Sequence, residues 1–412
     1  SWFAADVAAM EEKRFSLEEL GIAPESTVPE SAMSESAVSE NLQGEYTFRV
    51  SACLKEDTLW ADAGYEVAFG ETVEFCKDET AAGGMRADFL RVVHGDVNFG
   101  VHGEDFAVLF SKTDGGIVSM RRGGKEWISR PPVPVYWRAT TDNDRGNHFS
   151  VGSQMWIGAG MFFGCGSQDV EIKEEPGRVT VTYTYHLTVV PAAVTKVTYV
   201  VTPDGKIQVE AHYFGEKGLP QMPAFGMRLR IPGRMKTFSW YGLGPEECYP
   251  DRMEGARMGI YTRTPEENCS PYLVPQECAS RAGCRWLQVE DENGNVLKFQ
   301  AGVNEGDTAE AMAEAAMAGA AEENGAFNRD AKKETRPAFQ ASVLPFTAEE
   351  LETAMHWDEL PSPQYTNVCI YSAMRGVGGD DSWGAPVYPE YCVSAEKDQV
   401  LRFTISMEKK NG

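Results

Sequence analysis

The chain has 412 residues, of which 42% are hydrophobic, and its 62 acidic and 38 basic residues give a formal net charge of -24. Such an acidic surface repels phosphate, which argues against nucleic acids and anionic membranes as partners and leaves neutral ligands such as sugars open. No run of about 18 apolar residues is present, so no segment is predicted to span a membrane. The length predicts two domains, or one unusually large all-β unit.

The cysteines and the first residues both bear on location. Nine cysteines are spaced irregularly and include no C-x-x-C pair, which favours scattered thiols over a zinc site or a disulfide framework. The first residues, "SWFAADVAAMEEKRF", are acidic where a secretory signal needs a basic region and an apolar core. We therefore expect a cytoplasmic protein.

The N-terminal part predicts a small domain. Residues 22–43 are rich in Ser, Glu and Pro and read as a long acidic loop. Residues 44–75 predict only a few strands, which is enough for part of a small sandwich. A boundary is expected within residues 78–90, "DETAAGGMRADFL". We assign residues 1–84 to the partial sandwich and residues 85–412 to one large double sheet.

Strand patterns dominate the second domain. Three hairpins are predicted to turn at Gly115-Gly116, at Pro203-Asp204-Gly205 and at Asn293-Gly294. Within residues 178–189, apolar and polar side chains alternate strictly, so one face is predicted to be buried. The residues of that face are Val179, Val181, Tyr183, Tyr185, Leu187 and Val189. Residues 305–325 are instead Ala- and Glu-rich and predict an exposed helix or a disordered insertion between strands.

Three further stretches are unlike ordinary strands or turns. In residues 135–147, "VYWRATTDNDRGN", three short polar side chains follow a strand. They suit recognition of sugar hydroxyls, but composition alone favours a turn that bonds its own backbone. Residues 240–252, "WYGLGPEECYPDR", mix aromatic residues with Gly and Pro. They fit a sugar-binding shelf, or a packed corner between sheets in which Arg252 pairs with a carboxylate.

Residues 376–384, "GVGGDDSWG", place a tryptophan on a glycine-rich segment. The ring could stack on the apolar face of a pyranose, or could fold back as a plug over the end of a sheet. Glycoside hydrolysis needs two carboxylates about 5 to 9 Å apart. The adjacent Asp380 and Asp381 point to opposite sides of an extended chain, so they form a poor acid/base couple.

These stretches resemble, in the same order, the C-terminal part of the large β-galactosidases of glycoside hydrolase family 2. The motifs are "WRATTDNDRG", "WYGLGPEECYPDR", "PYLVPQECASRAGCRWLQV", "LPFTAEELETAMHWDELP" and "GVGGDDSWG". The resemblance runs from about residue 45 to the end. It implies an all-β fold, with a partial immunoglobulin-like β-sandwich followed by an antiparallel β-supersandwich of the galactose-mutarotase-like type.

The resemblance also implies roles for particular residues. Trp383 matches a tryptophan that offers a stacking surface at the rim of the active site, and Gly146 matches the hinge of a mobile loop near it. The stretch "PQE" is followed in the family by Asn-Gly-Asn-Arg, whereas this chain has residues 278–281, "CASR", so the resemblance does not extend to that turn. The candidate substrate-binding residues are Arg138, Asp142, Asn143, Asp144 and Trp383.

Other parts of the family's site are not matched by this sequence. The catalytic glutamates and the metal sites, for magnesium and sodium, lie in the family on a barrel, and no alternating strand and helix pattern predicts a barrel here. We therefore expect no catalytic residue, metal ligand or cofactor in this chain, and no hydrolysis without a catalytic barrel or large subunit. The full enzyme is expected to bind a β-galactoside and to be a homo-oligomer.

The chain could be a natural small subunit, since some family members are split, or a piece of a longer enzyme, which its start within a sandwich favours. A free-standing carbohydrate-binding module is the alternative function. An aldose epimerase is a third hypothesis, which rests on fold alone because no matching His and Glu motif is present.

Overall fold

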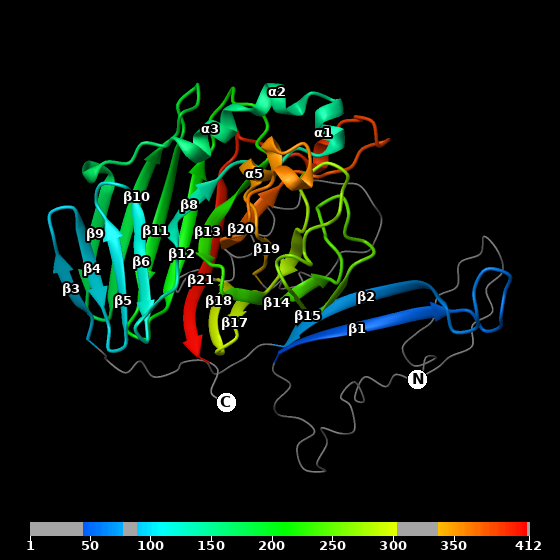
Figure 1. The fold of residues 1–412 in the computed structure, drawn as a ribbon, viewed down its shortest axis with the longest axis horizontal. Helices are drawn as coiled ribbons and strands as arrows, with labels where there is room; N and C mark the ends of the chain where they lie inside the picture. Colours follow the sequence, from blue (N-terminus) through cyan, green and yellow to red (C-terminus); the bar gives the residue numbers. More distant parts are fainter. Residues whose placement is uncertain (1–43, 77–88, 303–336, 410–412) are drawn as a thin grey trace, which may run out of the picture. The chain divides into compact units, whose positions relative to one another are not determined.

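The computed structural model describes residues 44–76, 89–302 and 337–409 (Figure 1). The chain divides into two compact units, Ser1–Gly83 and Gly84–Gly412. In the first unit, strands β1 (Gly44–Cys53) and β2 (Glu66–Cys76) form an antiparallel hairpin. An immunoglobulin-like sandwich around this hairpin stays a prediction, and the acidic stretch 22–43 lies outside the described residues.

A nine-stranded antiparallel sheet is the largest element of the second unit. Its strands, from one edge to the other, are β15 (Arg257–Arg263), β14 (Met235–Gly244), β17 (Trp286–Asp291), β18 (Asn295–Ala301), β21 (Gln399–Lys409), β12 (Ile207–Phe214), β11 (Val194–Val201), β10 (Arg178–His186) and β9 (Val170–Glu175).

Two five-stranded antiparallel sheets complete this unit. The first contains, in spatial order, β16 (Arg281–Cys284), β19 (Phe339–Leu344), β20 (Tyr365–Met374), β13 (Ala224–Pro232) and β8 (Arg130–Val135). The second contains β3 (Arg91–His94), β4 (Asn98–His102), β5 (Phe106–Ser111), β6 (Gly116–Arg122) and β7 (Lys125–Glu126).

One hydrophobic core joins the three sheets. Val108 of β5, Tyr199 of β11 and Leu229 of β13 are all fully buried members of the same cluster. Polar side chains also bridge the sheets, since the hydroxyl of Tyr183 on β10 donates to the carbonyl oxygen of Ser111 on β5 at 2.8 Å. The fold is therefore an all-β antiparallel supersandwich, as the sequence predicts.

The alternation predicted for residues 178–189 is confirmed, because all six apolar residues of that face are buried, from Val179 to Val189. The hairpins predicted at Gly115-Gly116, at Pro203-Asp204-Gly205 and at Asn293-Gly294 are confirmed as well, since each pair of flanking strands is antiparallel. The insertion predicted at 305–325 lies outside the described residues.

Short helices and loops gather at one end of the sheets (Figure 1). The helices are α1 (Asp142–Gly146), α2 (Phe149–Ser153), α3 (Met155–Met161) and α5 (Ala348–Thr353), and the 3₁₀ turns are η2 (Ser167–Asp169), η3 (Trp357–Glu359) and η4 (Pro389–Tyr391). Among the described residues, no helix is both long and apolar enough to cross a membrane. The loop 376–385 lies at this same end of the unit, next to α1 (Figure 1).

Candidate functional site

The order of three strands brings two distant motifs together. Strand β13 pairs antiparallel with β8 on one side and with β20 on the other, so β8 and β20 run parallel and end at the same edge of the sheet. Arg138 follows the end of β8 by three residues, and Arg375 follows the end of β20 directly. The two arginines therefore emerge at one edge although 237 residues separate them (375 minus 138).

A single buried carboxylate lies between these two arginines. Arg138 Nη1 donates to Asp144 Oδ2 at 2.7 Å, and Arg375 Nη1 donates to Asp144 Oδ1 at 2.5 Å. The three side chains are between 1% and 3% exposed. Burial alone raises the pKa of Asp144, but the two guanidinium groups outweigh it and hold that pKa below its ordinary value.

Helix α1 carries this carboxylate and contacts the tryptophan loop. Thr141 caps the helix by accepting from Asp144 N at 3.2 Å, while the Asp144 carboxylate accepts from Thr141 N. The Asn143 amide donates to the carbonyl oxygen of Asp381 at 2.9 Å. Gly146 packs so closely on the loop that a Cβ there would overlap the carbonyl oxygen of Trp383. Its hinge role stays a prediction, but the close contact already explains a glycine.

The loop presents its tryptophan to solvent, and the side chain of Trp383 is 82% exposed. The backbone beneath it is well bonded, because Asp381 Oδ1 accepts from the N–H groups of Trp383, Gly384 and Ala385 at 2.8 to 3.1 Å. These donors lower the pKa of Asp381. The ring thus stands exposed on an ordered support instead of folding back as a plug.

The "PQE" stretch supports α1 from the other side. Gln276 Nε2 donates to Asp142 Oδ2 at 3.1 Å, and Arg145 Nη2 donates to the carbonyl oxygen of Pro275 at 3.0 Å. The next residue, Glu277, is buried and accepts from the Tyr249 hydroxyl at 3.1 Å. Burial raises the pKa of Glu277 to about 7, although Arg138 acts in the opposite direction.

The turn that follows Glu277 contains a residue other than glycine in the left-handed conformation. Ala279, which stands where the resembling family has Gly, has a φ of 72° and is fully buried. This conformation costs a residue with a Cβ about 1–2 kcal/mol. Its N–H donates to Glu247 Oε2 at 2.7 Å, which helps to hold the turn.

Residues 240–252 form a packed corner. Trp240 and Tyr249 are buried, and Arg252 pairs with Glu247. The rings of Trp240 and Tyr249 are therefore closed to a sugar, and the pairing of Arg252 with Glu247 is the one that the packed-corner interpretation predicts. A hollow of about 660 Å³ beside it is lined by residues 244–248, 251–256 and 270, with no aromatic side chain among them.

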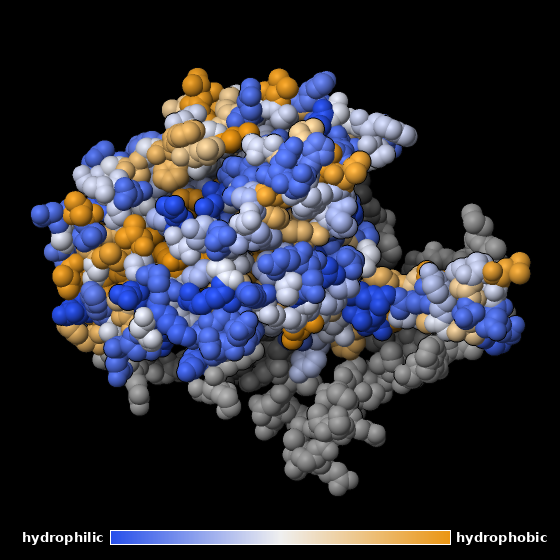
Figure 2. Space-filling model, viewed as in Figure 1, coloured by the Kyte–Doolittle hydropathy of each residue, from blue (hydrophilic) through white to orange (hydrophobic). Residues whose placement is uncertain are grey.

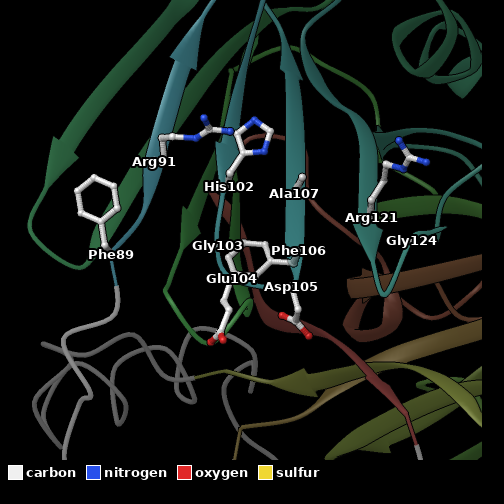
Figure 3. A pocket seen from close by; sticks show the side chains of 10 residues that line it. All are labelled: Phe89, Arg91, His102, Gly103, Glu104, Asp105, Phe106, Ala107, Arg121 and Gly124. Carbon is white, nitrogen blue, oxygen red and sulfur yellow. The ribbon is translucent and has the colours of Figure 1, made fainter.

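A second hollow, of about 650 Å³, lies on the β3–β7 sheet (Figure 3). Arg91, His102 and Arg121 come from β3, β4 and β6 of this sheet, while Glu104 and Asp105 lie at one end of the hollow (Figure 3). Both signs of charge line this open hollow, and it contains none of the candidate residues. We therefore place the candidate site at α1 and the tryptophan loop.

The structure separates the candidate residues into two groups. Trp383 and Asp142 are exposed, whereas Arg138, Asn143 and Asp144 are buried and bond to the protein itself. A role in substrate binding stays a prediction for all five. Among the described residues, no group of three or more His, Cys, Asp or Glu side chains is placed to hold a metal ion.

Sequence reasoning missed three supporting residues. Arg375 directly precedes the glycine-rich stretch, so its place in the sequence could have drawn attention to it. Asp251, which accepts from the N–H groups of Val377 and Gly378, and Glu277 lie within two of the motifs quoted above, but the sequence does not show which distant group either carboxylate accepts from.

The chain is similar to β-galactosidases, or to a subunit of one, along most of its length. Residues 102–407 match a family model described as "Beta galactosidase small chain", and residues 3–73 match one described as "Beta-galactosidase, domain 4". A β-galactosidase of Halalkalibacterium halodurans is 39% identical over 373 residues, which cover 89% of this chain and 33% of that protein. A β-galactosidase small subunit of Latilactobacillus sakei is 38% identical over 335 residues, covering 77% of this chain and 98% of the subunit.

The chain spans about a third of the length of the Halalkalibacterium halodurans and Lactobacillus delbrueckii β-galactosidases that it matches. Among solved structures, a galactose 1-epimerase of Lactobacillus acidophilus aligns with a TM-score of 0.41 and 8% identity, covering 79% of this chain and all of that one. So low a score supports no statement about function.

We predict that Asp144→Asn lowers the free energy of unfolding by about 3–5 kcal/mol, because it leaves two buried guanidinium groups without a counter-charge. Urea unfolding of the variant measures the loss. Asp142→Asn is the matched control, since the Asp142 side chain is 64% exposed and lies 3.7 Å from Arg145. It should change stability by less than about 0.5 kcal/mol. Equal effects of the two substitutions would contradict a central role for Asp144.

Glu277 predicts a pH dependence of stability. Its pKa is raised in the folded state to about 7, so the folded protein keeps a proton that the unfolded chain has already released. This contribution is fully present below about pH 4.5 and is lost as the pH rises through about 7. The shift corresponds to roughly 3 kcal/mol. Relative to wild type, Glu277→Gln should therefore gain stability between about pH 5 and pH 8. A difference between the two proteins that does not vary with pH would contradict the raised pKa.

Proposed function

Because the chain belongs to the β-galactosidase small-chain family, we propose that it is the non-catalytic part of a β-galactosidase. It completes the galactoside-binding site and takes part in hydrolysis of terminal β-galactosides only together with a catalytic part. That part is a catalytic barrel in the same polypeptide or a separate large subunit. The small subunit of Latilactobacillus sakei, which this chain covers over 98% of its length, supports the second arrangement.

The observation that carries this proposal is the presentation of Trp383. Its ring is 82% exposed, while the backbone on which it stands is fixed by the Asp381 carboxylate and by contacts with α1. An aromatic ring held in this way is suited to stack on a sugar, because little conformational freedom remains to be lost on binding. The exposed carboxylate of Asp142 lies on the same helix as Asn143 and can bond a hydroxyl group.

Arg138 and Asp144 act on this site indirectly. Both side chains are 1% exposed and face each other, so a sugar would have to displace an ion pair to reach them. Arg138 Nη2 also donates to the carbonyl oxygen of Gly376 at 2.8 Å, at the start of the tryptophan loop. We therefore assign to these two residues the positioning of α1 and the loop instead of direct contact with the substrate.

Exposed apolar side chains around the same end support a docking face for the catalytic part. Figure 2 shows apolar residues over α2 and α3. The exposed apolar residues on or next to α2, α3 and α5 are Val151, Met161, Phe162 and Met355. Monomeric proteins expose single apolar side chains everywhere, but several at one end are typical of an interaction surface.

Three further properties are proposed. Magnesium and sodium would bind on the catalytic part, as the family resemblance implies. Assembly of the full enzyme into a homo-oligomer is supported by the family resemblance. A cytoplasmic location is supported by the free thiols of the described residues, which include the buried Cys248, Cys278 and Cys284.

The free-standing carbohydrate-binding module is not favoured, because the relatives along most of the chain are β-galactosidases or a subunit of one. The aldose epimerase hypothesis has no support from the site, since neither of the two exposed candidate residues, Trp383 and Asp142, is the His or Glu that such an enzyme pairs.

A fusion protein tests the function. The Halalkalibacterium halodurans β-galactosidase would be shortened by the region that this chain matches, and the present chain would be joined in its place. We expect the fusion to hydrolyse a chromogenic β-galactoside, whereas the shortened relative and the present chain alone do not. The intact relative is the positive control. A folded fusion without activity, or hydrolysis by the present chain alone, would overturn the proposal.

Trp383→Ala in the active fusion should lower kcat/KM for a β-galactoside. The ratio of the two kcat/KM values should correspond to a loss of about 1–3 kcal/mol of binding energy, the scale of a lost aromatic contact. Phe89→Ala is the matched control, because Phe89 is also 82% exposed but lies beside the hollow on the β3–β7 sheet (Figure 3). Unchanged kinetics in the Trp383 variant would remove this residue from the site.

A further inference from the structure

The tryptophan loop is held at its start by a carboxylate from a distant turn. Asp251 Oδ2 accepts from the N–H groups of Val377 at 2.8 Å and Gly378 at 2.7 Å, and its Oδ1 lies 3.0 Å from the same Val377 nitrogen. On the other side of this segment, Arg138 donates to the carbonyl oxygen of Gly376. Charged groups from two separate segments thus bond the peptide unit between residues 376 and 377, and Asp251 also bonds the next unit.

The turn that carries Asp251 is itself fixed. Tyr249 and Arg252 exchange two backbone hydrogen bonds, of 3.2 and 2.8 Å, which leaves Pro250 and Asp251 at the tip. The Tyr249 ring is buried and its hydroxyl group donates to Glu277, while Arg252 pairs with Glu247. Since both flanking residues are anchored in the corner, the Asp251 carboxylate has a defined position relative to the sheet.

Two glycines of the loop lie directly against this carboxylate. A Cβ at Gly376 would lie 2.5 Å from Asp251 Oδ2, and one at Gly378 would lie 3.2 Å from it. The first distance is shorter than a normal contact, so a side chain at residue 376 would displace the Asp251 carboxylate from its bonds to the loop. A glycine-rich loop with converging N–H groups also resembles an anion-binding loop, but here the two N–H groups are occupied by the protein's own carboxylate.

We infer that Asp251 is a positioning residue for Trp383, which acts by fixing the start of the loop that presents the indole ring. This inference rests on the proposed function, in which Trp383 contacts the galactoside. Asp381 orders the tip of the loop from within, but it moves with the loop. Asp251 and Arg138 connect the loop to the sheets. Of the two, Asp251 accepts from the N–H groups of Val377 and of Gly378, the first glycine of the pair 378–379.

Hydrogen exchange of the full chain tests the contact itself, independently of any activity. In Asp251→Ala, the amides of Val377 and Gly378 should exchange about tenfold faster or more, because each loses a bond to a charged acceptor. Asp204→Ala is the matched control, since Asp204 also accepts from a backbone N–H, that of Lys206 in the hairpin between β11 and β12. Exchange in β10 and β11 reports whether the fold is intact, and Asp251→Asn replaces the alanine variant if that one does not fold. Unchanged exchange at 377–378 would overturn the inference.

Kinetics of the active fusion then test the effect on Trp383. Asp251→Ala should raise KM, and the double variant Asp251→Ala/Trp383→Ala should show no further loss beyond that of Trp383→Ala alone, because the first residue acts through the second. Asp204→Ala should leave KM unchanged. If the effects of the two substitutions multiply, or if Asp251→Ala leaves KM unchanged while Trp383→Ala raises it, Asp251 does not position the ring. If Trp383→Ala has no effect, the proposed role of Trp383 fails, and the positioning inference fails with it even where exchange at 377–378 is faster.

Discussion

The buried carboxylate of Asp144 is the constraint on which the site depends. Two guanidinium groups with almost no solvent contact stand side by side at the edge of a sheet, and neither would be tolerated there without an opposite charge. Asp144 meets both, and its own backbone closes the N-cap of α1 through Thr141. Moving α1 would therefore expose or unpair two charges at once. This requirement fixes the helix, and through Asn143 and Gly146 it also fixes the neighbouring tryptophan loop.

The sheet topology creates this requirement. Because β8 and β20 flank β13 and run in the same direction, the chain leaves both strands at one edge, and the residues that follow are forced into proximity. The extensive core beneath, with members from all three sheets, holds the strand ends in place. Polar side chains at the strand ends can then be arranged with little freedom, which is how a β-sandwich supports a binding loop. The site is thus a consequence of strand order more than of any one motif.

The sequence predicted the parts of this structure that local patterns encode. Strict alternation gave the buried face of β10, and Gly-containing turns gave three hairpins, since both depend on residues close together in the chain. The meeting of α1 with the loop at 376–385 came only from the resemblance, because the loop begins 230 positions after the end of α1 (376 minus 146). The supports provided by Asp251 and Glu277 were missed for the same reason. A carboxylate becomes a support only through the distant N–H or hydroxyl group that it accepts from, and the sequence does not show that pairing.

The turn at Ala279 has a backbone conformation that usually favours glycine, although its residue is alanine. The resembling family has a glycine there, and this chain has an alanine in the left-handed conformation. The bond from Ala279 N to Glu247 Oε2 and the one that the Ala279 carbonyl oxygen accepts from Asn268 help to offset the cost of this conformation. A turn can therefore contain a left-handed residue with a Cβ when neighbouring contacts help to hold it.

The ordered state of the loop bears on how the proposed site would work. Asp251 and Asp381 together bind five backbone N–H groups of residues 377–385, yet the ring that this loop carries is 82% exposed. A loop with no ligand to meet would gain nothing from holding a large apolar surface in water, since that arrangement forgoes the burial that usually stabilises a tryptophan. The ordering is instead what a binding surface needs before its partner arrives, because the conformational entropy is lost on folding and not again on binding. In the proposed function, the chain would thus prepare its share of the site within its own fold, before any catalytic part or sugar is bound.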